Sequence, residues 1–152
     1  MMLDQIDKKL LLLLQTDTKK TTKELSTILN LSVTAVYERI RKLEREKIIN
    51  KYVALLDGKK IDKGFVVFCQ IKLLQQTKEF ILGFEKEVIQ FHEILECFNI
   101  SGDYDYMLKI VVKDMEEYRI FLVNKLSTLH QIGSKHSTFM IGEVKNETKI
   151  VI

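Results

Sequence analysis

Residues 21–51, TTKELSTILNLSVTAVYERIRKLEREKIINK, have the pattern of two short helices joined by a tight turn. Thr21 and Glu24 have the spacing of a capping box, in which each side chain bonds the backbone N–H of the other residue, so a helix is predicted to begin there. Asn30 then turns the chain. The apolar residues of this first helix are spaced to share one face, and they are Leu25, Ile28 and Leu29.

The second helix of the segment is predicted to bury one face and expose the other. Ser32 is a favourable N-cap residue. The apolar stripe of this helix consists of Val33, Val36, Ile40 and Leu43. The residues left facing outward are Thr34, Tyr37, Glu38, Arg41, Lys42 and Arg45. A short helix, a tight turn and a second helix of this kind form the helix-turn-helix arrangement.

The outward residues of the second helix suit DNA chemically. A helix N-terminus at Ser32 presents backbone N–H groups to a phosphate. Arg41 can bond guanine through two N–H groups, Glu38 can accept from cytosine, and Thr34 can contact a thymine methyl group. Lys42 and Arg45 are expected to hold phosphates, and Tyr37 lies on the same face. From this segment alone, the alternative is an amphipathic helix whose charged face is only solvated.

The charge distribution of the chain favours a polyanion partner for its N-terminal part. Residues 1–64 contain 14 Lys and Arg against 9 Asp and Glu, a net charge of +5, whereas residues 65–152 contain 10 against 12, a net charge of −2. The longest apolar run, residues 10–14, is far shorter than a membrane span. No secretory signal is visible, so the expected location is the cytoplasm.

Nothing in the sequence indicates a metal or a cofactor. His92, His130 and His136 lack the spacing of a metal site, and there is no C-x-x-C motif. Cys69 and Cys97 lie in apolar strand-like runs and are expected to be buried thiols, since disulfides are rare in the cytosol. No nucleophile, zinc or phosphate-loop motif is present, so no enzyme activity is predicted.

The order of predicted elements indicates two domains. Asp4 is expected to cap a first helix with Asp7 at its third position, before the two helices described above. The helical and strand-like segments after them are strand 51–56, a turn at 57–60, strand 65–73, helix 77–91, strand 93–100, strand 104–112, helix 114–129, strand 132–144 and a short strand 149–152. The order βαββαβ is typical of a ferredoxin-like α+β domain. The predicted division is residues 1–50, a linking strand and hinge at 51–64, and residues 65–152.

Residues 101–106, Ser-Gly-Asp-Tyr-Asp-Tyr, form a corner between two predicted strands. Carboxylates beside free backbone groups can bind the amino group of a small zwitterion. The alternative is an ordinary turn in which Asp103 and Asp105 bond the local backbone while the tyrosines pack. The two carboxylates share a face only if the strand is regular through both, and a catalytic carboxylate pair is the least favoured interpretation.

Motifs along the whole chain resemble those of the Lrp/AsnC transcriptional regulators, also called leucine-responsive or feast/famine regulators. In the N-terminal part they are Leu3-Asp4-x-x-Asp7, Leu31-Ser32, Arg39-x-x-x-Leu43-Glu44 and Ile49-x-x-Tyr52. In the C-terminal part they are Ser101-Gly102-Asp103-Tyr104-Asp105-Tyr106, Val112-x-Asp114-x-x-x-Tyr118 and Val144-Lys145.

The resemblance implies an N-terminal winged or plain helix-turn-helix domain and a C-terminal ferredoxin-like effector domain, called RAM. It implies dimers that pair through the sheets and commonly assemble to octamers, with double-stranded DNA and an amino acid as partners. The residues expected to bind DNA are Ser32, Thr34, Tyr37, Glu38, Arg39, Arg41, Lys42 and Arg45. Those expected to bind the effector are Ser101, Gly102, Asp103, Tyr104 and Asp105, followed by His136, Thr138 and Met140.

Two departures from the family pattern are visible. Lys47 stands where the family often has glycine after the second helix of the motif. Because a left-handed non-glycine residue costs roughly 1 kcal/mol, the helix is expected to end differently here. Residues 129–131 read Leu-His-Gln instead of Leu-Pro-Gly, so a residue near the effector cleft is expected to differ from the family pattern.

The sequence therefore predicts a cytoplasmic, sequence-specific DNA-binding regulator whose assembly or DNA binding responds to an amino acid. One alternative is an amino-acid-binding module that acts through protein partners without reading DNA, against which the basic outward face argues. The other alternative is a small ferredoxin-like enzyme, but no set of catalytic residues is found in the sequence.

Overall fold

The computed structural model describes residues 2–152 and divides into two compact units. The first unit extends to Leu55 and also includes Val144–Ile152, and the second is Leu56–Glu143. The boundary lies inside the predicted linking segment 51–64. The last nine residues, placed by the sequence in the C-terminal domain, group with the N-terminal unit instead.

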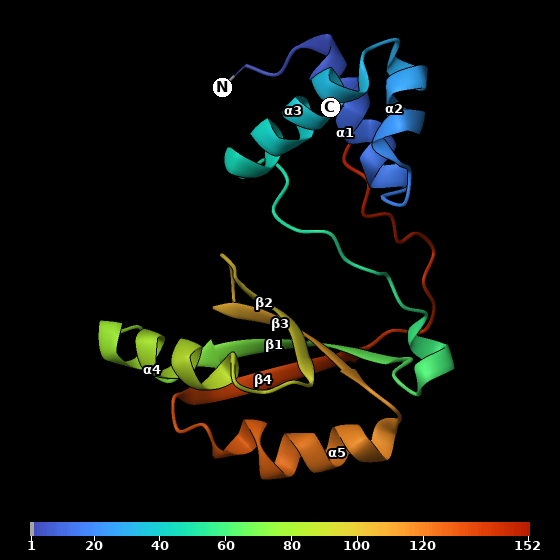
Figure 1. Cartoon of the computed structure of the whole chain (residues 1–152). Coiled ribbons are helices and arrows are strands. Elements are labelled where there is room, and N and C mark those ends of the chain that lie inside the picture. The colour runs from blue at the N-terminus through green and yellow to red at the C-terminus, as the bar shows by residue number, and fades with distance from the viewer. Residues whose placement is uncertain (1) are drawn as a thin grey trace. The chain divides into compact units, whose positions relative to one another are not determined.

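The first unit contains three helices: α1 (Gln5–Thr16), α2 (Thr22–Leu29) and α3 (Val33–Arg45) (Figure 1). Each begins where the sequence predicts. Asp4 with Asp7, and Thr21 with Glu24, form reciprocal capping boxes on α1 and α2. The Ser32 hydroxyl accepts a hydrogen bond of 3.1 Å from the Ala35 N–H at the start of α3.

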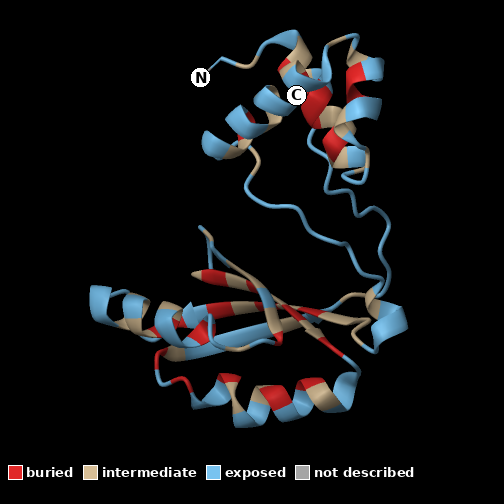
Figure 2. Cartoon of the chain, viewed as in Figure 1, coloured by how far each residue is buried: buried red, intermediate tan, exposed pale blue. Residues whose placement is uncertain are grey.

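A small apolar core joins the three helices, and Figure 2 shows its buried residues on the inner sides of α1, α2 and α3. The predicted stripes are only partly right, because Ile28 is 53% exposed and Val33 is 47% exposed. An eight-residue helix offers its neighbours a narrow stripe, which Leu25 and the half-buried Leu29 fill. The buried core consists of Leu10, Leu11, Leu14, Leu25, Val36 and Leu43.

Two helices of the first unit end with a left-handed residue. Asn30 has φ 54° after α2, and Lys47 has φ 57° after α3. The Ile48 N–H bonds the Leu43 carbonyl and the Lys47 N–H bonds the Glu44 carbonyl, which is the Schellman pattern. The prediction that α3 ends differently is therefore wrong, because these two bonds offset the cost of placing lysine where glycine is favoured.

The segments on either side of the unit boundary are irregular. Residues 51–56 and 149–152 were predicted as strands, and both predictions are wrong, since neither pairs with a neighbouring strand. Residue Ile150 instead bonds α1: its N–H donates to Gln15 Oε1 at 2.7 Å, and its carbonyl accepts from Gln15 Nε2 at 3.0 Å. The C-terminal segment is thus fixed to the first helix by two hydrogen bonds.

The second unit has the predicted order βαββαβ (Figure 1). A 3₁₀ turn (Gly58–Ile61) precedes β1, another (Leu126–Thr128) follows α5, and β4 ends at Phe139 instead of residue 144. The sheet is antiparallel in the order β2-β3-β1-β4. Its elements are β1 (Phe65–Leu73), α4 (Lys78–Val88), β2 (Ile94–Asn99), β3 (Tyr106–Val112), α5 (Met115–Asn124) and β4 (Ile132–Phe139).

Both helices of the second unit pack on one face of the sheet. Alternate residues of β1 and β3 point to that face and are buried, as the strand period of two requires (Figure 2). Cys69 belongs to this core, whereas Cys97, also expected there, is only partly buried. The core residues include Val67, Ile71, Phe84, Val88, Leu108, Ile110, Tyr118 and Phe121.

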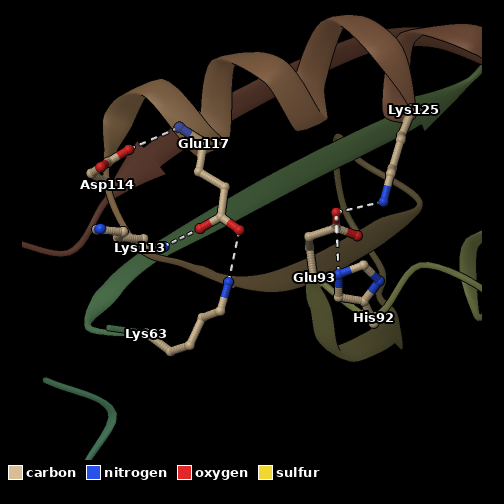
Figure 3. Close-up of polar contacts among 7 residues, drawn as sticks. All are labelled: Lys63, His92, Glu93, Lys113, Asp114, Glu117 and Lys125. Atoms are coloured by element: carbon tan, nitrogen blue, oxygen red, sulfur yellow. Dashed lines mark hydrogen bonds and ion pairs between the residues drawn. The ribbon is translucent and has the colours of Figure 1, made fainter. Parts of the chain in front are cut away.

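A carboxylate at the start of α5 joins this helix to the segment before β1 (Figure 3). Glu117 Oε1 accepts a 2.7 Å hydrogen bond from Lys63 Nζ, and its other oxygen accepts from the Lys113 N–H. The Asp114 carboxylate caps the same helix through the Glu117 N–H at 2.9 Å. These donors hold the pKa of Glu117 below its ordinary value.

A second carboxylate, Glu93, lies at the other end of α5 and is nearly buried (Figure 3). Lys125 Nζ donates to Glu93 Oε1 at 2.6 Å, and the exposed His92 Nε2 lies 3.6 Å from the same oxygen. Burial is the largest single influence on the pKa of Glu93 and raises it, but the hydrogen bonds from Lys125 and the backbone, together with the charges of His92 and Lys125, bring the pKa below its ordinary value. The pair therefore anchors the end of α5 to the start of β2.

Candidate nucleic-acid interface and ligand cavity

The outward face of α3 is exposed as predicted. Seven of the eight candidate DNA-binding side chains lie open to solvent in the first unit, and they are Ser32, Thr34, Tyr37, Glu38, Arg41, Lys42 and Arg45. The Ser32 cap and the positive end of the helix dipole lie at one end of this face, where an anion is favoured. Lys42 and Arg45 lie in the last turn at the other end.

Arg39 differs from the other seven because its guanidinium is held inside the unit. Its Nη1 lies 2.7 Å from Asp4 Oδ2 and 2.6 Å from Asp7 Oδ1. The two carboxylates raise the pKa of Arg39, while the Asp7 N–H and then Arg39 lower the pKa of Asp4. Since the Asp7 carboxylate is nearly buried, this contact fixes α3 against the start of α1. The structure therefore gives Arg39 a packing role, and its side chain is less exposed than that of Arg41, 28% against 62%.

Arg41 is the most favourably placed candidate for reading a base. Its side chain is 62% exposed, and its guanidinium carbon lies 5.7 Å from the centre of the Tyr37 ring. The two residues are four apart on α3, so the ring lies beside the guanidinium on the same helix face. A guanidinium supported by an aromatic ring keeps a defined position while its N–H groups stay available.

The 101–106 corner is built as a turn around Gly102. This residue has φ 120°, and a Cβ added there would meet nothing within 4 Å. Ser101 and Asp103 are exposed on either side. The Ile100 N–H bonds the Asp105 carbonyl at 2.9 Å and closes the loop. An open, left-handed glycine therefore leaves room for a ligand against the backbone of the corner.

Asp105 is tied to the sheet by several bonds. Its N–H donates to the Ile71 carbonyl at 2.8 Å, and its Oδ2 accepts from the Leu73 N–H at 2.7 Å. Its Oδ1 accepts from Gln76 Nε2 at 2.8 Å. The Leu73 contact differs from the alternative interpretation, in which the Asp residues bond local backbone, because Leu73 lies 32 residues earlier at the end of β1. A carboxylate has about four acceptor positions, so capacity remains for a ligand.

A cavity of about 380 Å³ lies at this corner, entirely within the second unit. The predicted residues Ser101, Gly102, Tyr104 and Asp105 line it, while Asp103 lies outside. The sequence missed the opposite wall, because no motif marked it. The lining residues that were not predicted to bind the effector are Leu73, Gln76, Ile81, Asn99, Ile100 and Tyr106.

The cavity combines one apolar wall with one polar wall. Leu73 and Ile81 supply the apolar wall, from β1 and α4. The Asn99 side chain is already engaged, since its Nδ2 donates to the Asp105 carbonyl at 3.0 Å. This composition suits a small ligand with an aliphatic part and a charged polar part.

The second predicted group, on β4 and just after it, does not line the cavity. His136 and Thr138 pair with Gln70 and Phe68 of β1, on the face of the sheet that the helices do not cover. The Met140 N–H bonds the Val66 carbonyl. The structure brings only His136 near the corner, with its ring 6.4 Å from the Tyr104 ring.

Residues 2–152 contain no group of three or more His, Cys, Asp and Glu arranged to hold a metal ion. In the same residues, no helix is long and apolar enough to cross a membrane.

Family models match both units of the chain. Residues 3–44 match the AsnC-type helix-turn-helix domain, and residues 66–150 match the Lrp/AsnC ligand binding domain. The first match ends one residue before the end of α3, and the second contains the corner and the cavity.

Relatives and solved structures agree with these matches. The leucine-responsive regulatory protein of Escherichia coli K12 is 37% identical over 150 residues, which are 99% of this chain and 92% of that protein. The Bkd operon transcriptional regulator of Pseudomonas aeruginosa is 34% identical over 142 residues, 93% of each chain. A Neisseria meningitidis transcriptional regulator, solved as a complex with L-Met, has a TM-score of 0.93 at 30% identity and covers 98% of this chain and 96% of its own.

Proposed function

The chain belongs to the Lrp/AsnC family of transcriptional regulators, and we propose that it reads DNA with the outward face of α3 and senses an amino acid at the corner of residues 101–106. It is a regulator with a helix-turn-helix domain and a ligand-binding domain, and not an enzyme. The observation that supports the DNA assignment is the exposed row of polar and basic side chains on α3, all but Arg45 in the part of the chain that matches the AsnC-type domain.

Within that row the roles follow from chemistry. Arg41, Glu38, Thr34 and Tyr37 face the base edges, and Ser32, Lys42 and Arg45 hold phosphates. Two copies related by a two-fold axis place two recognition helices in major grooves about 34 Å apart, or a multiple of that distance, on a pseudo-palindrome. The working unit is a homodimer, which assembles further to an octamer, in the cytoplasm where the DNA lies.

The DNA assignment is tested with duplexes that the wild-type protein selects from a random-sequence library. Arg41→Ala should weaken binding to the selected duplex by roughly 1–3 kcal/mol and relax the preference at one base position. Light scattering should show the same assembly for both proteins. If Arg41→Ala binds the selected duplex as tightly as the wild type at matched salt, Arg41 does not read a base.

The effector assignment rests on the cavity at the corner. An α-amino acid carries an ammonium group for the remaining acceptor positions of Asp105 and a carboxylate for the backbone around Gly102. Leu73 and Ile81 offer an apolar wall, so we expect an aliphatic or thioether side chain. The name of the E. coli relative and the L-Met complex of the Neisseria structure support this class of ligand. His136, Thr138 and Met140 belong to the proposal only as contributions to the same site from another copy.

Size-exclusion chromatography with light scattering, and thermal unfolding, should be measured with each of the twenty amino acids. A ligand that binds only the folded protein stabilises it by about 2.7 kcal/mol at a hundred times its Kd. One or a few aliphatic amino acids should therefore raise the unfolding midpoint or change the assembly. If none of the twenty amino acids changes the unfolding midpoint or the assembly, an amino-acid effector is excluded, while the DNA assignment is unaffected.

A further inference from the structure

A row of four side chains connects the DNA-reading face of α3 to the segment that follows the helices. The Tyr52 hydroxyl donates to Glu44 Oε1 at 3.1 Å. The other oxygen of Glu44 lies 3.5 Å from Arg41 Nη1, and the Arg41 guanidinium lies over the Tyr37 ring. All four residues belong to the first unit, and only Tyr37 and Arg41 lie on the predicted reading face.

Helix spacing and the end of α3 explain why these residues meet. Tyr37 and Arg41 are four residues apart, and Arg41 and Glu44 are three apart, so each pair is adjacent on the helix surface. Lys47 then reverses the chain in its left-handed conformation. The reversal brings Tyr52 back beside the last turn of α3, where its hydroxyl reaches Glu44.

An exposed ion pair alone fixes a side chain weakly, and such pairs contribute about 0–1 kcal/mol. Glu44 is a better anchor than an ordinary surface carboxylate, because Tyr52 holds one of its oxygens. Burial and Glu44 itself raise the pKa of Tyr52 to about 12, so the phenol remains a proton donor at any physiological pH. The carboxylate therefore presents its second oxygen to Arg41 from a defined position.

We propose that Tyr52 and Glu44 are positioning residues for DNA reading: Tyr52 fixes Glu44, and Glu44 fixes Arg41 against Tyr37 in the orientation that meets a base. The inference rests on the proposed role of Arg41 as a base-reading residue. The proposal adds Tyr52 to the residues that determine DNA sequence preference. Tyr52 lies after α3 and outside residues 3–44, which match the helix-turn-helix domain.

The geometry leaves Arg41 able to bind a base while it is held. A guanidinium has five N–H donors, and Glu44 engages only Nη1. The remaining donors are enough for a two-pronged contact with guanine. Fixing the side chain before binding removes part of the rotamer entropy that a long arginine otherwise loses at the interface.

The test compares Tyr52→Phe with the wild-type full chain, because this change removes one hydroxyl and no charge. Affinities are measured for the duplex that the wild type selects from a random library and for poly(dI-dC). Tyr52→Phe should lower the affinity for the selected duplex by about 3- to 10-fold, in line with one lost hydrogen bond. Its affinity for poly(dI-dC) should stay unchanged, and its unfolding midpoint should fall by no more than about 4 °C, as expected for one lost surface hydrogen bond, whereas a general structural defect would lower both substantially.

Double variants separate positioning from an independent effect. In the Arg41→Ala background, Tyr52→Phe should cost nothing further, because the residue that it positions is gone. Glu44→Gln should lower the ratio of specific to non-specific affinity, whereas Glu46→Gln, which removes the same charge near the same helix end, should not. Additive losses in the double variant, or unchanged specificity in Tyr52→Phe, would overturn the proposal.

The outcome for Arg41→Ala distinguishes this inference from the proposed function. If Arg41→Ala weakens specific binding and Tyr52→Phe does not, Arg41 reads DNA without positioning by Tyr52. If neither variant changes specific binding, the base-reading role of Arg41 fails, and the positioning proposal fails with it.

Discussion

Arg39 Nη1 lies 2.6 Å from the Oδ1 atom of Asp7, and this ion pair joins the recognition helix α3 to the first turn of α1. The Asp7 side chain is only 3% exposed, so its charge depends on Arg39 for compensation. The same carboxylate bonds the Asp4 N–H in the capping box of α1. One carboxylate thus serves both the start of α1 and the placement of α3.

Arg39→Met should destabilise the first unit by roughly 3 kcal/mol, because it leaves a buried carboxylate without its partner. Urea unfolding followed by circular dichroism measures the change. Arg41→Met is the matched control on the same helix, and it should stay within about 0.5 kcal/mol of the wild type. Equal stability of the two variants would show that Asp7 needs no compensation from Arg39.

Lys47→Gly should stabilise the protein by about 0.5–1 kcal/mol, because φ 57° is strained for lysine and free for glycine. Thermal unfolding measures the gain. Asn30→Gly is the control at the equivalent position after α2, and it should change stability less, since asparagine tolerates the left-handed region. A loss of stability in Lys47→Gly would mean that the lysine side chain contributes more than its backbone costs.

Lys42→Ala should weaken binding to every duplex by a similar factor and reduce the slope of log affinity against log salt by about 0.9. The reason is that Lys42 lies exposed in the last turn of α3, where a phosphate contact is expected. Titrations at several salt concentrations measure the slope. Lys78→Ala, in α4 of the second unit, is the control and should leave it unchanged. A base-specific loss for Lys42→Ala would contradict the assignment to phosphate.

Asp105→Asn should weaken binding of the responsive amino acid about tenfold or more, because it removes the charge that faces the ammonium group. Calorimetry on the full chain measures the affinity. The variant should also lose some stability, since the carboxylate accepts from the Leu73 N–H and from Gln76. Asp103→Asn, exposed and outside the cavity, is the control. Unchanged affinity in Asp105→Asn would exclude its carboxylate as the ammonium partner.

Acid should destabilise the second unit through Glu93. Its pKa in the folded protein is below the ordinary 4.5, because burial, which raises the pKa, is outweighed by the Lys125 and backbone hydrogen bonds and the nearby positive charges taken together. Stability from this group is therefore complete above 4.5 and is lost as the pH falls through the lower, folded-state pKa. Glu93→Gln should be less stable than the wild type at neutral pH and should lose less stability on acidification.

Urea unfolding at a series of pH values from about 7 to about 3 tests this prediction. Glu79→Gln removes a carboxylate from the exposed side of α4 and controls for the loss of charge alone. Parallel stability curves for Glu93→Gln and the wild type would contradict the role of the Glu93–Lys125 pair.

Local chemistry determined much of the first unit. The caps at Asp4, Thr21 and Ser32 lie where the sequence predicts, because a cap depends on residues within three positions of itself. The outward face of α3 was predictable for the same reason, since helix periodicity assigns each side chain to a face. The order βαββαβ also followed from periodicity and turn residues.

The tertiary structure decided what depends on residues distant in sequence. Residues 51–56 and 149–152 look like strands, but without a paired neighbour their backbones stay irregular. The cavity walls at Gln76 and Ile81 carry no motif, because their meeting with the corner arises from the packing of α4 and β1. Arg39 was expected to contact DNA, and only the tertiary structure shows that its guanidinium also holds Asp7, 32 residues earlier in the chain.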